Sequence, residues 1–170
     1  KKKFFKYFGI IFLSISFLIV YSLRNYDPCC NNYHAGLRLF IVTTIICIFT
    51  DIGGYIFGKL FKGPLLTKIS PNKTYSGLIG SYCLPLLTVS IFTKINIYEL
   101  ELNLKMFTFI LIVSSISQIG DIIISYFKRI SNIKDTGKII PGHGGILDRI
   151  DGMIFAFPAS YITYLNFLKF

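Results

Sequence analysis

Five apolar stretches divide the chain, and polar loops separate them. They run over Phe8 to Leu23, Leu37 to Gly58, Leu78 to Phe92, Met106 to Tyr126 and Ile154 to Phe170. A membrane-spanning helix needs about 20 mostly apolar residues, and backbone polar groups in a bilayer must be hydrogen-bonded within the chain, which favours helices. The pattern therefore predicts an all-α, polytopic transmembrane helix bundle of about five spans, forming a single membrane-embedded domain over residues 1–170.

The basic residues indicate how such a bundle would be oriented. Of the 18 lysines and arginines, 13 lie in the N-terminal flank or in the loops after the second and fourth stretches. Cytoplasmic loops of membrane proteins carry an excess of basic residues. We therefore expect an integral, multi-pass membrane protein with a cytoplasmic N-terminus and two basic cytoplasmic loops, in the inner or plasma membrane if the source is bacterial. No A-x-A-like cleavage site follows the first stretch, so we expect that stretch to be retained rather than removed as a signal peptide.

Composition supports the membrane assignment and limits the partners. The chain is 53% hydrophobic and 15% charged, whereas soluble domains carry about 25% charged residues. Its net charge of +10 would suggest nucleic acid in a soluble protein. Here the basic residues lie between apolar runs, which favours the lipid bilayer, anionic head groups or a phosphorylated substrate at the membrane surface, and no nucleic acid. The alternative is that the lysines only set topology.

Two predicted spans carry a carboxylate within a polar stripe. The fourth span places Asp121 among polar residues at intervals of three and four, so they share one helix face: Ser114, Ser117, Gln118, Ser125 and Lys128. The second span carries Asp51, with Gly54 and Gly58 spaced for close helix packing. Hydroxyls and an amide could simply join helices. Ionisable groups inside a membrane are costly and usually functional, so we favour a functional site at Asp121.

The segment before the last span combines acids, bases and glycines. Asp148 and Asp151 are three residues apart and share a face if a helix begins near Ile146. Clustered carboxylates are typical ligands of a hard cation, basic side chains suit phosphates, and a glycine-rich loop can bring backbone N–H groups to phosphate oxygens. An ordinary turn between helices is the alternative. Together these features indicate phosphoryl-transfer chemistry.

The same residues form a long motif. It comprises Ser125, Lys128-Arg129, Lys134-Asp135, the run Pro141-Gly142-His143-Gly144-Gly145, Asp148-Arg149 and Asp151. Two further blocks are Gln118 to Asp121 and Asp51 to Gly77. This pattern resembles the signature of the phosphatidate cytidylyltransferases, the integral membrane enzymes that make CDP-diacylglycerol, over Asp51 to about Phe157. Ser76 departs from it, because the family often has an acid there. Family members are usually longer, so the chain is expected to be a minimal or N-terminally short member.

The resemblance implies a reaction and a role for each residue of the motif. CTP and phosphatidate would give CDP-diacylglycerol and pyrophosphate, in phospholipid biosynthesis. Asp121 and Asp148, with Asp151 as a third carboxylate, would bind Mg²⁺, alone or with a second cation. Lys128, Arg129, Lys134 and Arg149 would hold phosphates, and His143 would donate to a phosphate or shape the loop. The remaining predicted substrate-binding residues are Lys59, Ser70, Lys73, Thr74, Ser125, Asp135, Gly144 and Gly145. A homodimer is implied by the resemblance only.

Other functions remain compatible with parts of the sequence. A transporter or channel could use the acidic stripe for ions, although it would leave the basic glycine loop unexplained. A related enzyme could transfer the cytidylyl group to another lipid phosphate, because nothing in the sequence reads the acyl chains. A non-catalytic protein that kept the fold is disfavoured by the three intact acids.

Overall fold

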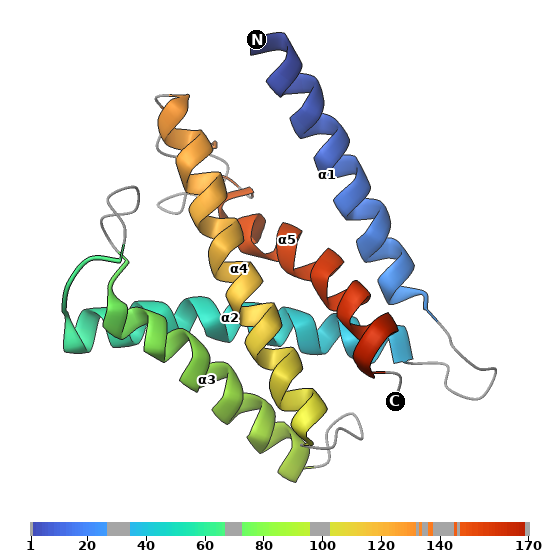
Figure 1. Ribbon diagram of the computed structural model, residues 1–170, viewed down its shortest axis with the longest axis vertical. Coiled ribbons are helices and arrows are strands. Elements are labelled where there is room, and N and C mark those ends of the chain that lie inside the picture. The colour runs from blue at the N-terminus through green and yellow to red at the C-terminus, as the bar shows by residue number, and fades with distance from the viewer. Residues whose placement is uncertain are drawn as a thin grey trace.

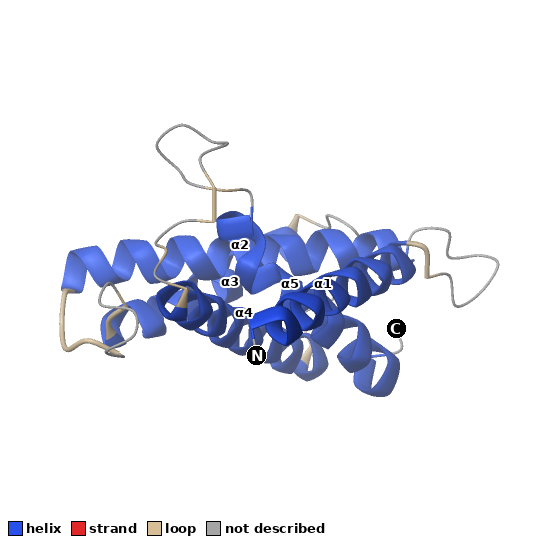
Figure 2. Cartoon of the chain, turned by 90° about the horizontal axis from the view of Figure 1, so that it is seen from above, coloured by secondary structure: helices blue, strands red, loops and turns tan. Residues whose placement is uncertain are grey.

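Within the residues that it describes, the computed structural model is a bundle of five α-helices (Figure 1). These residues are 2–26, 35–66, 73–95, 103–131, 133, 136–137, 145 and 147–168. The helices are α1 Lys2–Arg24, α2 Ala35–Phe61, α3 Tyr75–Lys94, α4 Leu104–Ile130 and α5 Leu147–Thr163, which continues as a π-helix over Tyr164–Leu168. The predicted all-α fold is confirmed. In Figure 2, α2 runs along one side of the bundle.

The length and apolar composition of its helices identify the chain as a membrane protein. In the described part of the chain, α2, α3 and α4 are long and apolar enough to cross a bilayer. The apolar part of α1, Gly9–Arg24, is shorter, and α5 has 17 residues before its π-helical extension. Large apolar side chains such as Ile48, Ile91 and Ile112 are exposed, as expected where helices face lipid. The last helix begins at Leu147, earlier than the apolar run from Ile154 suggested, because it includes the acidic segment.

The hydrophobic core occupies one end of the bundle. It is built from the C-terminal ends of α1 and α3, the first halves of α2 and α4, and the end of α5 and its π-helix; its members include Leu23, Leu39, Ile46, Val89, Phe109, Val113, Phe157 and Tyr164. Phe40 and Phe157 stack there with ring centroids 5.2 Å apart. The second halves of α2 and α4 and the beginnings of α3 and α5 lie beyond this core, and they carry the polar residues.

Glycines set the spacing of α2 and α3, which make the most extensive helix pair among the described elements. A Cβ added to Gly77 would lie 2.6 Å from the Gly54 carbonyl oxygen, and one added to Gly80 would lie 2.6 Å from that of Gly53. The two backbones therefore touch directly, as in small-residue packing of membrane helices. A Cβ on Gly54 would meet nothing nearer than 3.8 Å, whereas one on Gly53 would lie 2.3 Å from the Gly80 carbonyl oxygen. The close approach therefore requires glycine at Gly53 rather than at the predicted Gly54.

Glycines also bring α4 and α5 together, but against side chains. A Cβ on Gly120 would lie 2.7 Å from Cδ2 of Phe155, and one on Gly152 would lie 2.7 Å from Oγ of Ser117. Each glycine directly neighbours an aspartate in the sequence, Asp121 on α4 and Asp151 on α5. The close approach of the two helices thus places these two carboxylates on facing surfaces.

Candidate active site

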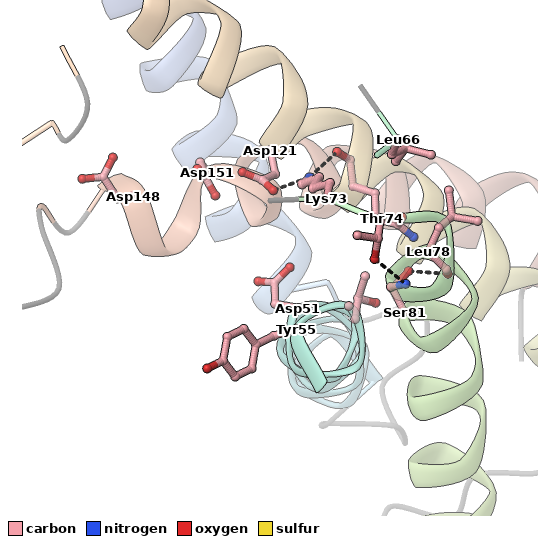
Figure 3. Close-up of a pocket in the computed structure, with 14 residues that line it drawn as sticks. Asp51, Tyr55, Leu66, Lys73, Thr74, Leu78, Ser81, Asp121, Asp148 and Asp151 are labelled. Atoms are coloured by element: carbon pink, nitrogen blue, oxygen red, sulfur yellow. Dashed lines mark hydrogen bonds and ion pairs between the residues drawn. The ribbon is translucent and has the colours of Figure 1, made fainter. Parts of the chain in front are cut away.

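A cavity of about 300 Å³ lies at the polar end of the bundle. Residues of α2, α3, α4, α5 and the segment preceding α3 surround it (Figure 3). Four carboxylates face it, those of Asp51, Asp121, Asp148 and Asp151, and so does Lys73. The other lining residues are Thr50, Gly54, Tyr55, Leu66, Thr74, Gly77, Leu78, Ser81 and Gln118. A concave site with several convergent charged groups is a default candidate for ligand binding.

Helix α4 presents its predicted polar stripe towards α2, α3 and α5. Ser114 and Ser117 are buried, and Thr50 of α2 lies with its hydroxyl 3.0 Å from that of Ser114. One turn further along, Gln118 and Asp121 line the cavity. Ser125 donates a hydrogen bond of 3.4 Å to Asp121 Oδ1. The prediction that this stripe faces the bundle interior is confirmed.

The first turn of α5 holds Asp148 in a dense set of donors. The backbone N–H groups of Thr136 and Gly145 each donate to Asp148 Oδ2 at 2.9 Å, and the Lys128 ammonium lies 3.0 Å from Oδ1. Burial alone would raise the pKa of Asp148, but these N–H groups and Lys128 outweigh it and lower that pKa to about 2. Asp148 therefore remains ionised at neutral pH.

Lys128 links the two acids of α5. Its ammonium lies 3.6 Å from Asp151 Oδ2 as well as 3.0 Å from Asp148 Oδ1. Because Lys128 is in the last turn of α4 and the acids are in the first turns of α5, the lysine joins the two helix ends. Predicted as a phosphate ligand, it is also the counter-ion of both carboxylates.

Lys73 approaches the same carboxylates from the α3 side. It forms an ion pair with Asp121, and its ammonium lies 3.5 Å from the Gln118 carbonyl oxygen. Local hydrogen bonds fix its position: Leu66 N–H donates to the Lys73 carbonyl at 2.7 Å, and the next residue, Thr74, caps α3 by accepting from Gly77 N–H at 3.1 Å. An antiparallel bridge between Leu65 and Thr74 thus holds the Lys73 backbone where its ammonium reaches α4.

Ser76 stands where the motif often has an acid, and in this chain it stabilises the turn between α2 and the segment before α3. Its hydroxyl donates to the Lys62 carbonyl at 2.6 Å and lies 3.0 Å from the Thr74 hydroxyl. Lys62 and Gly63 turn the chain at the end of α2 with φ values of 48° and 134°, and glycine is favoured at the second. A carboxylate could not donate to the Lys62 carbonyl, so the substitution suits this turn.

Comparison with known proteins adds the family. The model of the cytidylyltransferase family matches residues 1–167. The chain belongs to this family. It is 35% identical over 162 residues to a phosphatidate cytidylyltransferase of Staphylococcus haemolyticus (strain JCSC1435), and 35% over 163 residues to one of Staphylococcus aureus (strain COL). It is 36% identical over 160 residues to one of Staphylococcus epidermidis (strain ATCC 35984). Each alignment covers 93% of this chain and 57% of the relative's length.

Most predicted site residues that the structure describes gather at this cavity. Lys73, Thr74, Asp121, Asp148 and Asp151 line it, while Ser125, Lys128 and Gly145 contact its carboxylates. Lys59 and Arg129 are exposed near helix ends and do not line it. The predictions for Ser70, Lys134, Asp135, His143 and Gly144, and for the side chain of Arg149, lie outside the described part of the structure.

Several cavity residues were not predicted as site residues. The sequence placed Asp51 inside the second predicted span, and its helix now places it in the cavity with Thr50 and Tyr55. Gln118 was part of the polar stripe but had been compatible with helix joining; its Nε2 atom is buried without a hydrogen-bond partner in the structure. Leu66, Leu78 and Ser81 gave no sequence signal, because only the packing of α3 and its preceding loop brings them there.

Whether a divalent cation fits the cavity depends on the carboxylates that face it. Among the described residues, no three His, Cys, Asp or Glu side chains lie close enough together to hold a metal by themselves, and lysines pair with Asp121 and Asp148. Mg²⁺, however, usually takes one or two carboxylates, with waters and substrate phosphates completing its shell. The carboxylates facing the cavity fit that mode, and they do not form a complete protein cage.

Proposed function

We propose that the protein transfers the cytidylyl group of CTP to phosphatidate, giving CDP-diacylglycerol and pyrophosphate. The observation that carries this proposal is the shared cavity of acids from α2, α4 and α5 and the ammonium of Lys73, in a chain of the cytidylyltransferase family. A water-soluble triphosphate and a lipid phosphate must meet where polar groups border an apolar bundle. The relatives named as phosphatidate cytidylyltransferases support this substrate pair.

The reaction needs charge neutralisation and alignment. A phosphate oxygen of phosphatidate attacks the α-phosphorus of CTP, the new P–O bond forms, and the bond to the bridging oxygen breaks with its electrons leaving on pyrophosphate. Such transfer depends mainly on positioning and electrostatic stabilisation. Lys73 and Lys128 would each exchange a carboxylate partner for phosphate oxygens, because both already lie at the cavity in ion pairs.

We propose Mg²⁺ as the cofactor, held by Asp121 together with Asp148 or Asp151. When bound, it would neutralise phosphate charge. Within the protein, Ser125 orients the Asp121 carboxylate through the hydrogen bond to Oδ1. The N–H groups of Thr136 and Gly145 do the same for Asp148. These supporting donors hold the carboxylates in position, which is how surrounding hydrogen bonds orient the ligands of a metal.

Labelled CTP provides the direct test. Membranes containing the chain are incubated with CTP labelled at the α-phosphate, phosphatidate and Mg²⁺, and label is measured in extracted lipid. We expect CDP-diacylglycerol that depends on phosphatidate and disappears on chelation with EDTA. Absence of labelled lipid, from membranes in which the detergent-extracted chain elutes as a single folded species, would contradict the proposal.

Replacing phosphatidate separates the two remaining alternatives. If another lipid phosphate, such as an unsaturated ether-lipid phosphate, is labelled faster than phosphatidate, the reaction class holds and the substrate is wrong. A transporter would show ion or solute flux in sealed vesicles without nucleotide. Sidedness can be measured in the same vesicles: we propose a cytoplasmic site, so Lys62→Cys, at the exposed turn after α2, should react with an impermeant thiol reagent only from that face.

A further inference from the structure

Tyr55 of α2 is the aromatic side chain at the cavity. Among the described residues that line it, Tyr55 is the only aromatic one, and it is 67% exposed. The exposed ring projects from α2 on the turn after Asp51, and both side chains border the region that the α4 and α5 carboxylates face from the other side (Figure 3). A large, open aromatic surface beside a charged cavity needs a reason.

The side chains along this face of α2 follow a regular order. Asp51, Tyr55 and Lys59 are four residues apart, so they stack on one face at intervals of about 6 Å. The Lys59 ammonium lies 5.6 Å from the centroid of the Tyr55 ring and 3.5 Å from its hydroxyl. This contact holds a cation near the ring, while the exposed fraction shows that most of the ring surface is still open.

The position of Tyr55 relative to the charged groups limits what it can bind. Lys73 pairs with Asp121, and Lys128 with Asp148, so the phosphate-binding chemistry belongs to the α4 and α5 side. A nucleoside triphosphate is polar and charged at one end and carries a flat, aromatic base at the other. With its phosphates on that side, its base must extend away from those ion pairs, and Tyr55 offers the flat surface that bases stack on.

We propose that Tyr55 is the stacking platform for the nucleotide base, with Lys59 steadying the ring from its side. This inference rests on the proposed use of CTP and adds the subsite that holds its base. Base–aromatic stacking is tolerant of base identity, because every base has a π-face. Tyr55 therefore supplies affinity for the nucleoside end. Discrimination between bases depends on other groups that form hydrogen bonds with the edge of the base.

The absence of tryptophan in the sequence makes a direct test possible. Tyr55→Trp introduces a single indole at the platform. We expect Mg²⁺-CTP to quench its fluorescence, UTP to quench it as well, and inorganic triphosphate to leave it unchanged. Tyr126→Trp is the matched control, because Tyr126 is 48% exposed on α4 and does not line the cavity. Equal quenching in both variants, or none at Tyr55→Trp while CTP binds, would overturn the proposal.

Two further variants test the ring itself by equilibrium binding in detergent. Tyr55→Leu should bind CTP roughly 10-fold more weakly, whereas Tyr55→Phe should bind it within about 2-fold of the parent because the ring is kept. Inorganic triphosphate should bind all three proteins equally. CTP affinity unchanged in Tyr55→Leu would mean that the ring serves only as an interfacial aromatic. If the parent binds neither CTP nor triphosphate, the proposed function itself fails.

Discussion

The two close helix pairs of this bundle use glycine for different ends. In α2–α3, glycine faces glycine through backbone oxygens, Gly77 against Gly54 and Gly80 against Gly53, with the Phe57 side chain also against Gly80. In α4–α5, glycine faces a residue that carries a side chain: Gly120 faces the Phe155 ring, and Gly152 faces the hydroxyl and the carbonyl oxygen of Ser117. The first pair is a scaffold of touching backbones, and the second pair brings charged residues together.

The distribution of charge follows the same division. Three of the four carboxylates at the cavity come from α4 and α5, while α2 contributes Asp51. The α3 side supplies Lys73, the counter-ion of Asp121. We therefore expect the stability of the α2–α3 scaffold pair to depend on side-chain volume. We expect the activity of the site on α4 and α5, the charged pair, to depend on charge. Each of the following changes tests one side of that contrast.

The largest effect is expected at Asp121. Asp121→Asn keeps the size of the side chain but removes the charge that pairs with Lys73, so the proposed transfer of label from CTP to lipid should fall by about 10²–10³-fold. Expression and the elution profile in detergent should be unchanged, because the helix contacts of Gly120 remain. Full activity of this variant would remove Asp121 from the site.

Loss of the Lys73 ammonium should act next most strongly. Lys73→Met should raise the KM for CTP by roughly 10–100-fold, because hydrogen bonds to charged groups contribute about 1.5–3 kcal/mol. Lys73→Arg should recover most of the affinity. Lys94→Met, an exposed lysine at the far end of α3, is the control and should behave as the parent. An unchanged KM in Lys73→Met would show that Lys73 serves Asp121 alone.

The scaffold pair should respond to a single methyl group. Gly80→Ala puts a Cβ against Phe57 and the Gly53 carbonyl, and overpacking of this kind costs about 1–3 kcal/mol in the free energy of unfolding. Gly9→Ala is the matched change, because nothing lies within 4 Å of the added atom, and it should stabilise α1 by up to about 1 kcal/mol. Thermal unfolding in detergent measures both; equal midpoints would contradict the backbone-contact picture.

A smaller effect is expected where α2 meets α4. The Thr50 hydroxyl donates to the Ile46 carbonyl at 2.7 Å and lies 3.0 Å from Ser114 Oγ. Thr50→Val should therefore lower the free energy of unfolding by about 0.6 kcal/mol, the average for an interhelical hydrogen bond in a membrane protein. Thr108→Val, on the exposed face of α4, should cost less. A larger loss of unfolding free energy for Thr108→Val than for Thr50→Val would show that the contact of Thr50 with Ser114 does not stabilise the packing of α2 on α4.

Much of the site follows from local sequence rules. The stripe from Ser114 to Lys128 shares one face because of helical periodicity alone. Helix α5 begins at Leu147, which meets the condition, a helix start near Ile146, under which Asp148 and Asp151 share a face. Intramembrane position made Asp51 conspicuous before any packing was known. The predicted Mg²⁺ site stays a prediction, since the described residues include no group of three possible metal ligands.

Other features depended on the rotation and approach of neighbouring helices. Nothing in the sequence paired Lys73 with Asp121, which lie far apart in the chain. Lys59 and Arg129 matched the motif, yet their positions near helix ends leave them outside the cavity lining. Such positions are decided by contacts between helices, and the periodicity of a sequence carries no information about those contacts.

The sequence by itself determined the five helices, their apolar surfaces and the face on which each acid lies, because hydropathy and helical periodicity are properties of consecutive residues. Only the tertiary structure decided that four carboxylates and a lysine share one cavity and that Tyr55 stands at its edge. The reason is that glycine contacts set the distance between α2 and α3 and between α4 and α5, and those contacts join residues that do not neighbour each other in the sequence.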